Sequence, residues 1–338
     1  MRLADKPTLA RNQIANGLAG WENTAEHWMS IQENDISWQV LRRIVHDWAG
    51  SSAELTEVKP LEGGCINTTL ALMTSGGPRA VLKISPHRVN REFLREANQL
   101  AHLKGLGIPV PEVYFSHLAN LENPHSYLLM EFVDGVDLNS AKRHCNSEEF
   151  DDLQKHLAEL VLILHSQRGE EYGREKEGEP KFADWAKFYR HVYEPMWHEV
   201  EKSGVLPKGS RKQIAKLHEK LEKWIAHDDC PRLVHWDIWA ANVMAMPDAT
   251  GKWRISALLD PNCKYAHGEA EIAYMELFHT VNGAFLKSYQ QTFKLGDGYQ
   301  RIRKPIYQLY ELINHVHLFG PEYLKPMMTT FERIAPML

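Results

Sequence analysis

Cysteine is scarce in this chain. Four cysteines occur among 338 residues, namely Cys65, Cys145, Cys230 and Cys263, and none stands at the short spacing of a metal or redox motif. The sequence therefore argues against a disulfide scaffold and a zinc site. So few cysteines in so long a chain are typical of a reducing compartment, and we expect a cytoplasmic protein.

Long apolar runs and an excess of positive charge are also missing. No apolar stretch approaches the roughly 18 residues of a membrane-spanning helix, and Asp5 and Lys6 stand where a secretory signal needs apolar residues. The formal net charge of −5 gives no basic field that would attract nucleic acid or anionic lipid. We expect a soluble protein that binds neither nucleic acid nor membranes.

What remains is the composition of an ordinary globular protein. Hydrophobic residues make up 43% and charged residues 25% of the chain, which argues against disorder. At about 150 residues per domain, the length predicts two domains or lobes.

The N-terminal part changes from a polar stretch to a pattern of strands. Residues 1–34 are polar and weakly periodic, so we expect an N-terminal extension. A helix is predicted from Asp35, as its cap, to Gly50. After this helix the apolar pattern changes to that of strands, which are predicted at 55–61, 66–73, 80–85, 113–117 and 126–132, with one helix at 90–104. Residues 35–133 are therefore predicted to form a small α+β lobe.

The remaining residues, 134–338, carry mainly helical periodicity. Helices are predicted at 148–165, 182–202, 210–227, 270–280, 283–293, 301–318 and 322–335. Short strands are predicted at 232–235 and 255–259, and the charged interval 168–180 is predicted to be an exposed loop. A β-rich N-lobe followed by a larger helical C-lobe predicts an α+β, bilobal, protein-kinase-like fold.

The most specific motif has the form His-x-Asp-x4-Asn, in His235, Asp237 and Asn242. An apolar run ending in Asp260 follows eighteen residues after Asn242. Phosphoryl transfer needs a carboxylate near the acceptor hydroxyl and metal ions on the phosphates. Asp237 suits the first role, and Asn242 and Asp260 are hard oxygen ligands suited to Mg²⁺. A local turn network is the alternative, and His235 is predicted to be structural.

A lysine lies in the middle of a predicted strand. Lys83 follows Ala-Val-Leu, and Glu96 comes thirteen residues later in the predicted helix. A cation on an apolar strand needs a partner, which an ATP phosphate and a helix glutamate would provide. Glu92 is the competing partner, and a solvent-facing edge lysine is the alternative interpretation.

Two backbone features complete a nucleotide site. Gly63 and Gly64 join two predicted strands, where backbone amides can approach phosphates. Glu131 and Val133 lie where the strands give way to helices, and their backbone groups could bind a purine edge. An ordinary turn and an ordinary linker are the alternatives. The chain has no GxxxxGK[ST] motif, so a Walker-type loop is not supported.

These elements, in this order, resemble the aminoglycoside phosphotransferase-like branch of the kinase fold. Pro261 follows Asp260 where protein kinases have Phe-Gly, so a small-molecule acceptor is expected. Residues 257–278 and 309–320, together with 64–67 and Trp239, look like the fructosamine (ketosamine) kinase family. The resemblance covers roughly residues 38–335.

The resemblance implies a reaction and a set of roles. The reaction is ATP-dependent phosphorylation of a sugar hydroxyl on a ketoamine adduct, which reverses glycation. Small-molecule or glycated-amine acceptors are the implied partners, ATP and Mg²⁺ the cofactors, and a monomer or homodimer the assembly. The implied residues are Gly63, Gly64, Lys83, Glu96, Glu131 and Val133 for ATP, Asp237 as base, Asn242 and Asp260 for Mg²⁺, and Trp239, His267 and Glu269 for the acceptor.

The chain also departs from the family's usual pattern. Trp236 stands where the family usually has glycine, and residues 262–264 and Gly268 differ as well. A kinase of another hydroxyl compound, such as an aminoglycoside or a free sugar, is therefore the alternative. A non-catalytic nucleotide-binding protein is a remote one. Cys65 lies in the glycine loop, where backbone amides could lower a thiol pKa, and it is predicted to make activity sensitive to oxidation.

Overall fold

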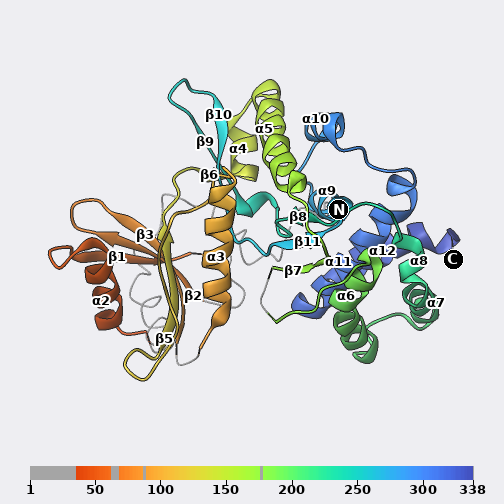
Figure 1. Cartoon of the computed structure of the whole chain (residues 1–338), viewed down its shortest axis with the longest axis horizontal. Helices are drawn as coiled ribbons and strands as arrows, with labels where there is room; N and C mark the ends of the chain where they lie inside the picture. The colour runs from red at the N-terminus through yellow and green to blue at the C-terminus, as the bar shows by residue number, and fades with distance from the viewer. Residues whose placement is uncertain (1–35, 62–67, 87–88, 176–177, 338) are drawn as a thin grey trace. The chain divides into compact units, whose positions relative to one another are not determined.

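The computed structural model describes residues 36–61, 68–86, 89–175 and 178–337 (Figure 1). They divide into two compact units whose boundary in the sequence falls between Asp134 and Gly135. The expected extension over 1–34 lies outside the described residues. The same is true of Gly63, Gly64 and Cys65.

The N-terminal unit is built on one antiparallel sheet. The strand order is β1-β2-β3-β5-β4. The hairpin between β2 and β3 turns at Gly76 and Gly77, whose positive φ angles favour glycine. All five strands lie within two residues of their predicted positions: β1 (Leu55–Pro60), β2 (Thr68–Thr74), β3 (Arg79–Pro86), β4 (Val113–His117) and β5 (His125–Glu131).

One helix packs on each face of this sheet. Tyr127 and Leu129 of β5 pack with α2 (Trp38–Ala49), whereas Leu128 and Met130 pack with α3 (Arg91–Gly105) (Figure 1). This alternation is the two-residue period of a strand buried on both faces.

The start of α2 corrects one expectation. The helix begins at Trp38, and its N-cap is Ser37, whose hydroxyl accepts a hydrogen bond from the Val40 amide at 3.3 Å. Asp35, the expected cap, lies outside the described residues. Ser37 is an equally favoured cap residue, so composition alone did not distinguish the two.

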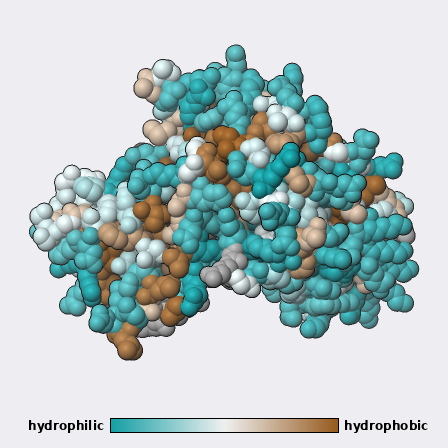
Figure 2. Space-filling view, viewed as in Figure 1, coloured by the Kyte–Doolittle hydropathy of each residue, from teal (hydrophilic) through white to brown (hydrophobic). Residues whose placement is uncertain are grey.

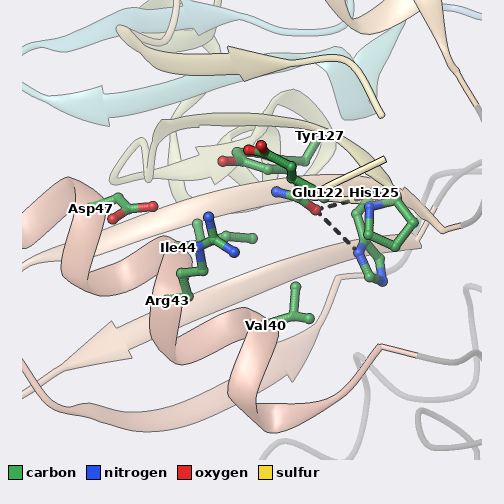
Figure 3. Close-up of a pocket in the computed structure, with 9 residues that line it drawn as sticks. Val40, Arg43, Ile44, Asp47, Glu122, His125 and Tyr127 are labelled. Carbon is green, nitrogen blue, oxygen red and sulfur yellow. Dashed lines mark hydrogen bonds between the residues drawn. The ribbon is translucent and has the colours of Figure 1, made fainter. Parts of the chain in front are cut away.

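A small cavity of about 80 Å³ lies on the α2 face (Figure 3). Val40, Arg43 and Asp47 of α2 line it opposite His125 and Tyr127. Because Tyr127 belongs to the α2 face, this cavity lies across the sheet from α3.

The C-terminal unit is mainly helical and carries two three-stranded sheets, β10-β9-β6 and β7-β11-β8. Its strands are β6 (Val136–Asp137), β7 (Gly173–Arg174), β8 (Arg232–Val234), β9 (Val243–Pro247), β10 (Trp253–Leu258) and β11 (Lys264–Ala266). Its α-helices are α4 (Leu138–His144), α5 (Ser147–Ser166), α6 (Trp185–Lys202), α7 (Lys208–Glu219), α8 (Leu221–Ile225), α9 (Gly268–Leu277), α10 (Gly283–Thr292), α11 (Lys304–Phe319) and α12 (Leu324–Ile334).

Several local expectations in this unit were incomplete. The predicted helix 210–227 is two helices, α7 and α8, because the helix is interrupted at Lys220. Leu217 and Leu221 are buried on either side of this interruption. Apolar spacing therefore continues through the break and hides it. The interval 168–180 is not wholly an exposed loop, since β7 pairs with β11 and Tyr172 is buried. The short elements β6, α4, β9 and β11 were not predicted.

Hydrophilic residues cover most of the visible face of the C-terminal helices (Figure 2). Within the described ranges, no helix is both long enough and apolar enough to cross a membrane.

Candidate active site

The loop that carries Asp237 connects β8 to a short 3-10 helix, η3 (Ala240–Asn242). Two backbone hydrogen bonds fix its ends. The amide of Asn262 donates to the carbonyl of His235 at 3.0 Å, and the amide of Leu259 donates to the carbonyl of Asn242 at 2.8 Å. The loop therefore lies against the segment that contains Asp260.

The carboxylate of Asp237 is held at both oxygens. The phenol of Tyr274 donates to Oδ1 at 2.5 Å, and the side-chain amide of Asn242 donates to Oδ2 at 2.9 Å. The same amide nitrogen donates to the backbone carbonyl of Asp237 at 3.0 Å. The two donors come from α9 and η3, so the orientation of the carboxylate depends on two separate elements.

Trp236 has a left-handed backbone, with φ of 67°. Such a conformation is costly for any residue with a Cβ and costs glycine little. It provides a physical reason for a glycine at this point in a catalytic loop. In this chain a tryptophan adopts it instead.

Contacts on both the backbone and the ring hold Trp236. Its amide donates to Oε1 of Glu271 at 2.6 Å. Its ring lies 4.7 Å from Nζ of Lys264, a cation–π contact, and 6.4 Å from the ring of Trp185. Lys264 is only 2% exposed, and its ammonium also donates to the carbonyl of Asn262 at 2.9 Å.

Glu271 is a buried carboxylate with further partners. Its Oε2 lies 2.8 Å from Nε2 of His165, and both side chains are fully buried. Nδ1 of His165 lies 2.7 Å from the hydroxyl of Tyr289. A continuous chain of hydrogen bonds therefore connects α10 through α5 and α9 to the loop that carries Asp237.

His235 lies in the interior. Its Nδ1 accepts a long hydrogen bond, 3.4 Å, from the amide of Asp237. Burial lowers the pKa of His235 from 6.5 to about 4. A neutral ring can accept that hydrogen bond, whereas a charged ring could not.

The two predicted metal ligands lie on adjoining segments. Asn242 makes both of its hydrogen bonds to Asp237 through the amide nitrogen, so they do not use the amide oxygen. Asp260 follows β10 with φ of 57°. Nowhere in the described ranges do three or more His, Cys, Asp or Glu side chains form a group that could hold a metal ion. One amide and one carboxylate still fit Mg²⁺, which retains waters and binds substrate phosphates.

In the N-terminal unit, Lys83 contacts Glu96. The strand period assigns Ala80, Leu82 and Ile84 to the α2 face, so Lys83 faces α3. Nζ of Lys83 lies 2.5 Å from Oε1 of Glu96, and the two side chains are 12% and 15% exposed.

Glu92, the competing partner of Lys83, pairs instead with Arg95 one turn along the helix. Glu131 ends β5, and its amide and carboxylate bond to the backbone of Glu112 at 2.8 and 3.0 Å. Val133 follows that strand end, and the roles of Glu131 and Val133 toward a nucleotide stay predictions.

His267 and Glu269 lie at the start of α9. The ring of His267 stacks on His227 with 3.5 Å between the centroids. The carboxylate of Glu269 receives two hydrogen bonds from Arg303, at 2.6 and 2.8 Å, and one from the amide of Gly296 at 2.8 Å. Both residues line a pocket of about 290 Å³ together with residues of α10 and of the segment after it. On the same helix, Tyr274 is the residue that meets Asp237.

Trp239 is the N-cap residue of η3, and its carbonyl accepts a hydrogen bond from the amide of Asn242 at 2.9 Å. The indole is half-buried.

Four residues that contribute to this arrangement were not predicted from the sequence, namely Glu271, Tyr274, His165 and Tyr289. One signal was present. The helix α9 is buried at nearly every position, yet its sequence contains three glutamates. Buried charges need partners, so a buried ion pair or hydrogen bond at Glu271 could have been predicted. Nothing comparable in the sequence marked the phenol of Tyr274.

Known proteins resemble this chain in both sequence and fold. The model of the fructosamine kinase family matches residues 37–336. A chloroplastic protein-ribulosamine 3-kinase of Oryza sativa subsp. indica is 26% identical over 303 residues, covering 86% of this chain and 82% of that protein. A probable ketoamine kinase of Enterococcus faecium is 28% identical over 278 residues, covering 79% and 91%.

Solved structures agree on the kinase-like fold. A candidate fructosamine-3-kinase of Haemophilus somnus has a TM-score of 0.70 at 22% identity, covering 88% of this chain and 97% of that one. The aminoglycoside phosphotransferase APH(4)-Ia, in complex with AMP-PNP and hygromycin B, has a TM-score of 0.61 at 16% identity, covering 87% and 95%. The expected α+β, protein-kinase-like fold is confirmed. Because the family model spans nearly the whole chain, this protein belongs to the fructosamine kinase family of ATP-dependent phosphotransferases that act on a sugar hydroxyl.

Proposed function

We propose that this enzyme phosphorylates a sugar hydroxyl of a ketoamine adduct, with Asp237 as the general base. The observation that carries the proposal is the fixed carboxylate of Asp237, which accepts hydrogen bonds from Tyr274 and Asn242. The names of the relatives, ribulosamine and ketoamine kinases, support the class of acceptor.

In the proposed reaction the acceptor hydroxyl oxygen forms a bond to the γ-phosphorus of ATP. The bond from that phosphorus to the bridging oxygen of ADP breaks, and ADP leaves with its electron pair. The hydroxyl proton goes to the Asp237 carboxylate. The protein contributes mainly position and charge to such a transfer, so a carboxylate held in one orientation is the feature it requires.

Charged and backbone groups would bind the nucleotide. Lys83, held by Glu96, is proposed to contact ATP phosphates. Asn242 and Asp260 would hold Mg²⁺, which neutralises phosphate charge when bound. The backbone of Glu131 and Val133 is proposed to bind the purine edge, and the loop of Gly63 and Gly64 to cover the phosphates.

Trp239 is proposed to line the acceptor site. Its half-buried indole could pack on the C–H groups of a sugar ring two residues past the base. His267 and Glu269 are proposed to contribute from the pocket at the start of α9, where Glu269 would act through the guanidinium of Arg303.

The test is ATP consumption by the wild type against fructosyl-lysine, ribulosyl-lysine, free sugars and aminoglycosides. We expect turnover with a ketoamine. We also expect Asp237→Asn to lower kcat by roughly 10²–10⁴-fold, the usual contribution of a general base, and to leave the Kd of Mg·ATP unchanged.

The matched control is Asp248→Asn. Asp248 is an exposed aspartate of the same unit whose carboxylate bonds to Thr250, and its loss should leave kcat unchanged. If the enzyme phosphorylated only aminoglycosides, the proposed ketoamine acceptor would be wrong. An Asp237→Asn enzyme as active as wild type would remove Asp237 as the base.

A further inference from the structure

Tyr274 brings a phenol to the carboxylate of Asp237 from a helix that begins 31 residues after it in the chain. The ring is 6% exposed and packs against Phe278, with 4.9 Å between the centroids. The hydroxyl lies 2.5 Å from Oδ1 of Asp237. A buried phenol usually finds a hydrogen-bond partner, and in this protein that partner is the proposed catalytic base.

The direction of this hydrogen bond is set by protonation. Burial, and then the negative charge of Asp237, hold the pKa of Tyr274 well above its ordinary value. The phenol therefore keeps its proton at neutral pH and donates a hydrogen bond to the carboxylate.

We propose that Tyr274 is a positioning residue that fixes the orientation of the Asp237 carboxylate for the acceptor hydroxyl. This inference rests on the proposed function, because it needs Asp237 to be the base. Asn242 donates to Oδ2 and Tyr274 to Oδ1, so neither oxygen can rotate away without breaking a hydrogen bond. A carboxylate oxygen can accept more than one hydrogen bond, so the bonds from Asn242 and Tyr274 do not by themselves exclude one from the acceptor hydroxyl.

The helix α9 makes this arrangement rigid. Glu271 and Tyr274 are three residues apart, which puts them on one face of the helix. Glu271 binds the backbone of Trp236 while Tyr274 binds the side chain of Asp237, the next residue. One buried helix therefore holds both the backbone of the catalytic loop and the base that it carries.

The competing explanation is that the hydroxyl only satisfies burial. Tyr299 provides a matched control in the same unit. Its ring is 1% exposed, and its hydroxyl donates to Oε2 of Glu276 at 2.6 Å. It is thus another buried phenol bound to a carboxylate. That carboxylate, Glu276 of α9, is not part of the proposed site.

The experiment compares the steady-state kinetics and the Tm of Tyr274→Phe and Tyr299→Phe with wild type. We expect Tyr274→Phe to lower kcat by roughly 10- to 100-fold, the size of a lost hydrogen bond to a charged group, without changing the KM for ATP. Tyr299→Phe should keep the wild-type kcat. Equal losses of kcat in the two variants, each with a lowered Tm, would assign the hydroxyl to stability and overturn the proposal.

A second arm separates this inference from the proposed function. In the Asp237→Asn background, Tyr274→Phe should cause no further loss of kcat, because its effect passes through the carboxylate. An inactive Asp237→Asn enzyme beside a fully active Tyr274→Phe enzyme would overturn this inference and leave the proposed function standing. A fully active Asp237→Asn enzyme would instead overturn the proposed function.

If Tyr274→Phe does not fold, Tyr274→Met, which also lacks the hydroxyl, is judged by the same measurements.

Discussion

The backbone amide of Trp236 donates a 2.6 Å hydrogen bond to the buried carboxylate of Glu271. This bond connects the residue before the proposed base to a buried side chain of α9. The other carboxylate oxygen of Glu271 is hydrogen-bonded to His165. The position of the loop that carries Asp237 therefore depends on a fully buried carboxylate.

Removing that carboxylate should loosen the loop. Glu271→Ala leaves the Trp236 amide and the His165 ring without an acceptor, so we expect the free energy of unfolding to fall by roughly 2–4 kcal/mol. The kcat should fall as well. Denaturant unfolding and kinetics check this, with Glu271→Gln, which keeps an oxygen acceptor, as the milder variant. An alanine variant as stable as wild type would contradict the prediction.

The left-handed backbone of Trp236 predicts an unusual order of stability. Trp236→Gly and Trp236→Ala both lose the contacts of the ring with Lys264 and Trp185. The glycine variant should nevertheless be the more stable of the two by about 1 kcal/mol, because φ of 67° disfavours alanine. Urea unfolding of both variants measures the difference. Equal stabilities would mean that the loop changes its backbone when the indole is removed.

Trp239→Ala should act on the acceptor. We expect a higher KM for the acceptor, or a lower kcat through a misplaced hydroxyl, and an unchanged KM for ATP. Kinetics with acceptor and ATP varied separately decide the matter. A selective rise in the KM for ATP would reassign the residue.

The metal ligands should differ in their response to Mg²⁺. Asp260→Ala and Asn242→Ala should both weaken Mg·ATP-dependent activity. Excess Mg²⁺ should restore Asn242→Ala only in part, because this variant also loses the hydrogen bond to Oδ2 of Asp237. Titration of kcat with Mg²⁺ tests this. Unchanged metal dependence in both variants would count against the assignment.

Stability should fall as the pH drops below neutrality. The pKa of His235 is about 4 in the folded protein, because burial disfavours the charged ring, and 6.5 is its ordinary value. The unfolded chain therefore binds a proton between these pH values that the folded protein does not bind. The contribution of His235, roughly 3 kcal/mol, is fully present above pH 6.5 and is lost as the pH falls toward 4.

Unfolding free energies at pH 5 and pH 7, for wild type and His235→Gln, measure this contribution. The variant should show a shallower dependence on pH. Some dependence should remain, because burial also lowers the pKa of His218 and of His227 to about 4. The same slope in both proteins would exclude His235 as its source.

Short-range sequence patterns predicted much of this structure. A lysine on an apolar strand and a glutamate on the next helix predicted a pair, and Lys83 and Glu96 form it, because both the strand period and the helix period are short-range properties of the chain. The five strands of the first sheet were found for the same reason.

The parts that escaped prediction depend on contacts between distant residues. Tyr274 is hydrogen-bonded to Asp237, which lies 37 residues away in the sequence, and His165 to Glu271, which lies 106 residues away. No local period encodes either meeting. Strands of two or three residues, such as β7 and β11, are too short to show a period and exist because a neighbouring strand pairs with them.

The burial of Lys264 has a chemical consequence for an enzyme proposed to work among glycated amines. A reducing sugar modifies a lysine when the uncharged amine attacks the aldehyde carbon of the sugar, so the aldehyde must be able to reach that amine. The ammonium of Lys264 lies 4.7 Å from the ring of Trp236 and is shielded from solvent. In the folded protein, Lys264 is therefore inaccessible to glycation. Glycation is the modification whose products this enzyme is proposed to phosphorylate.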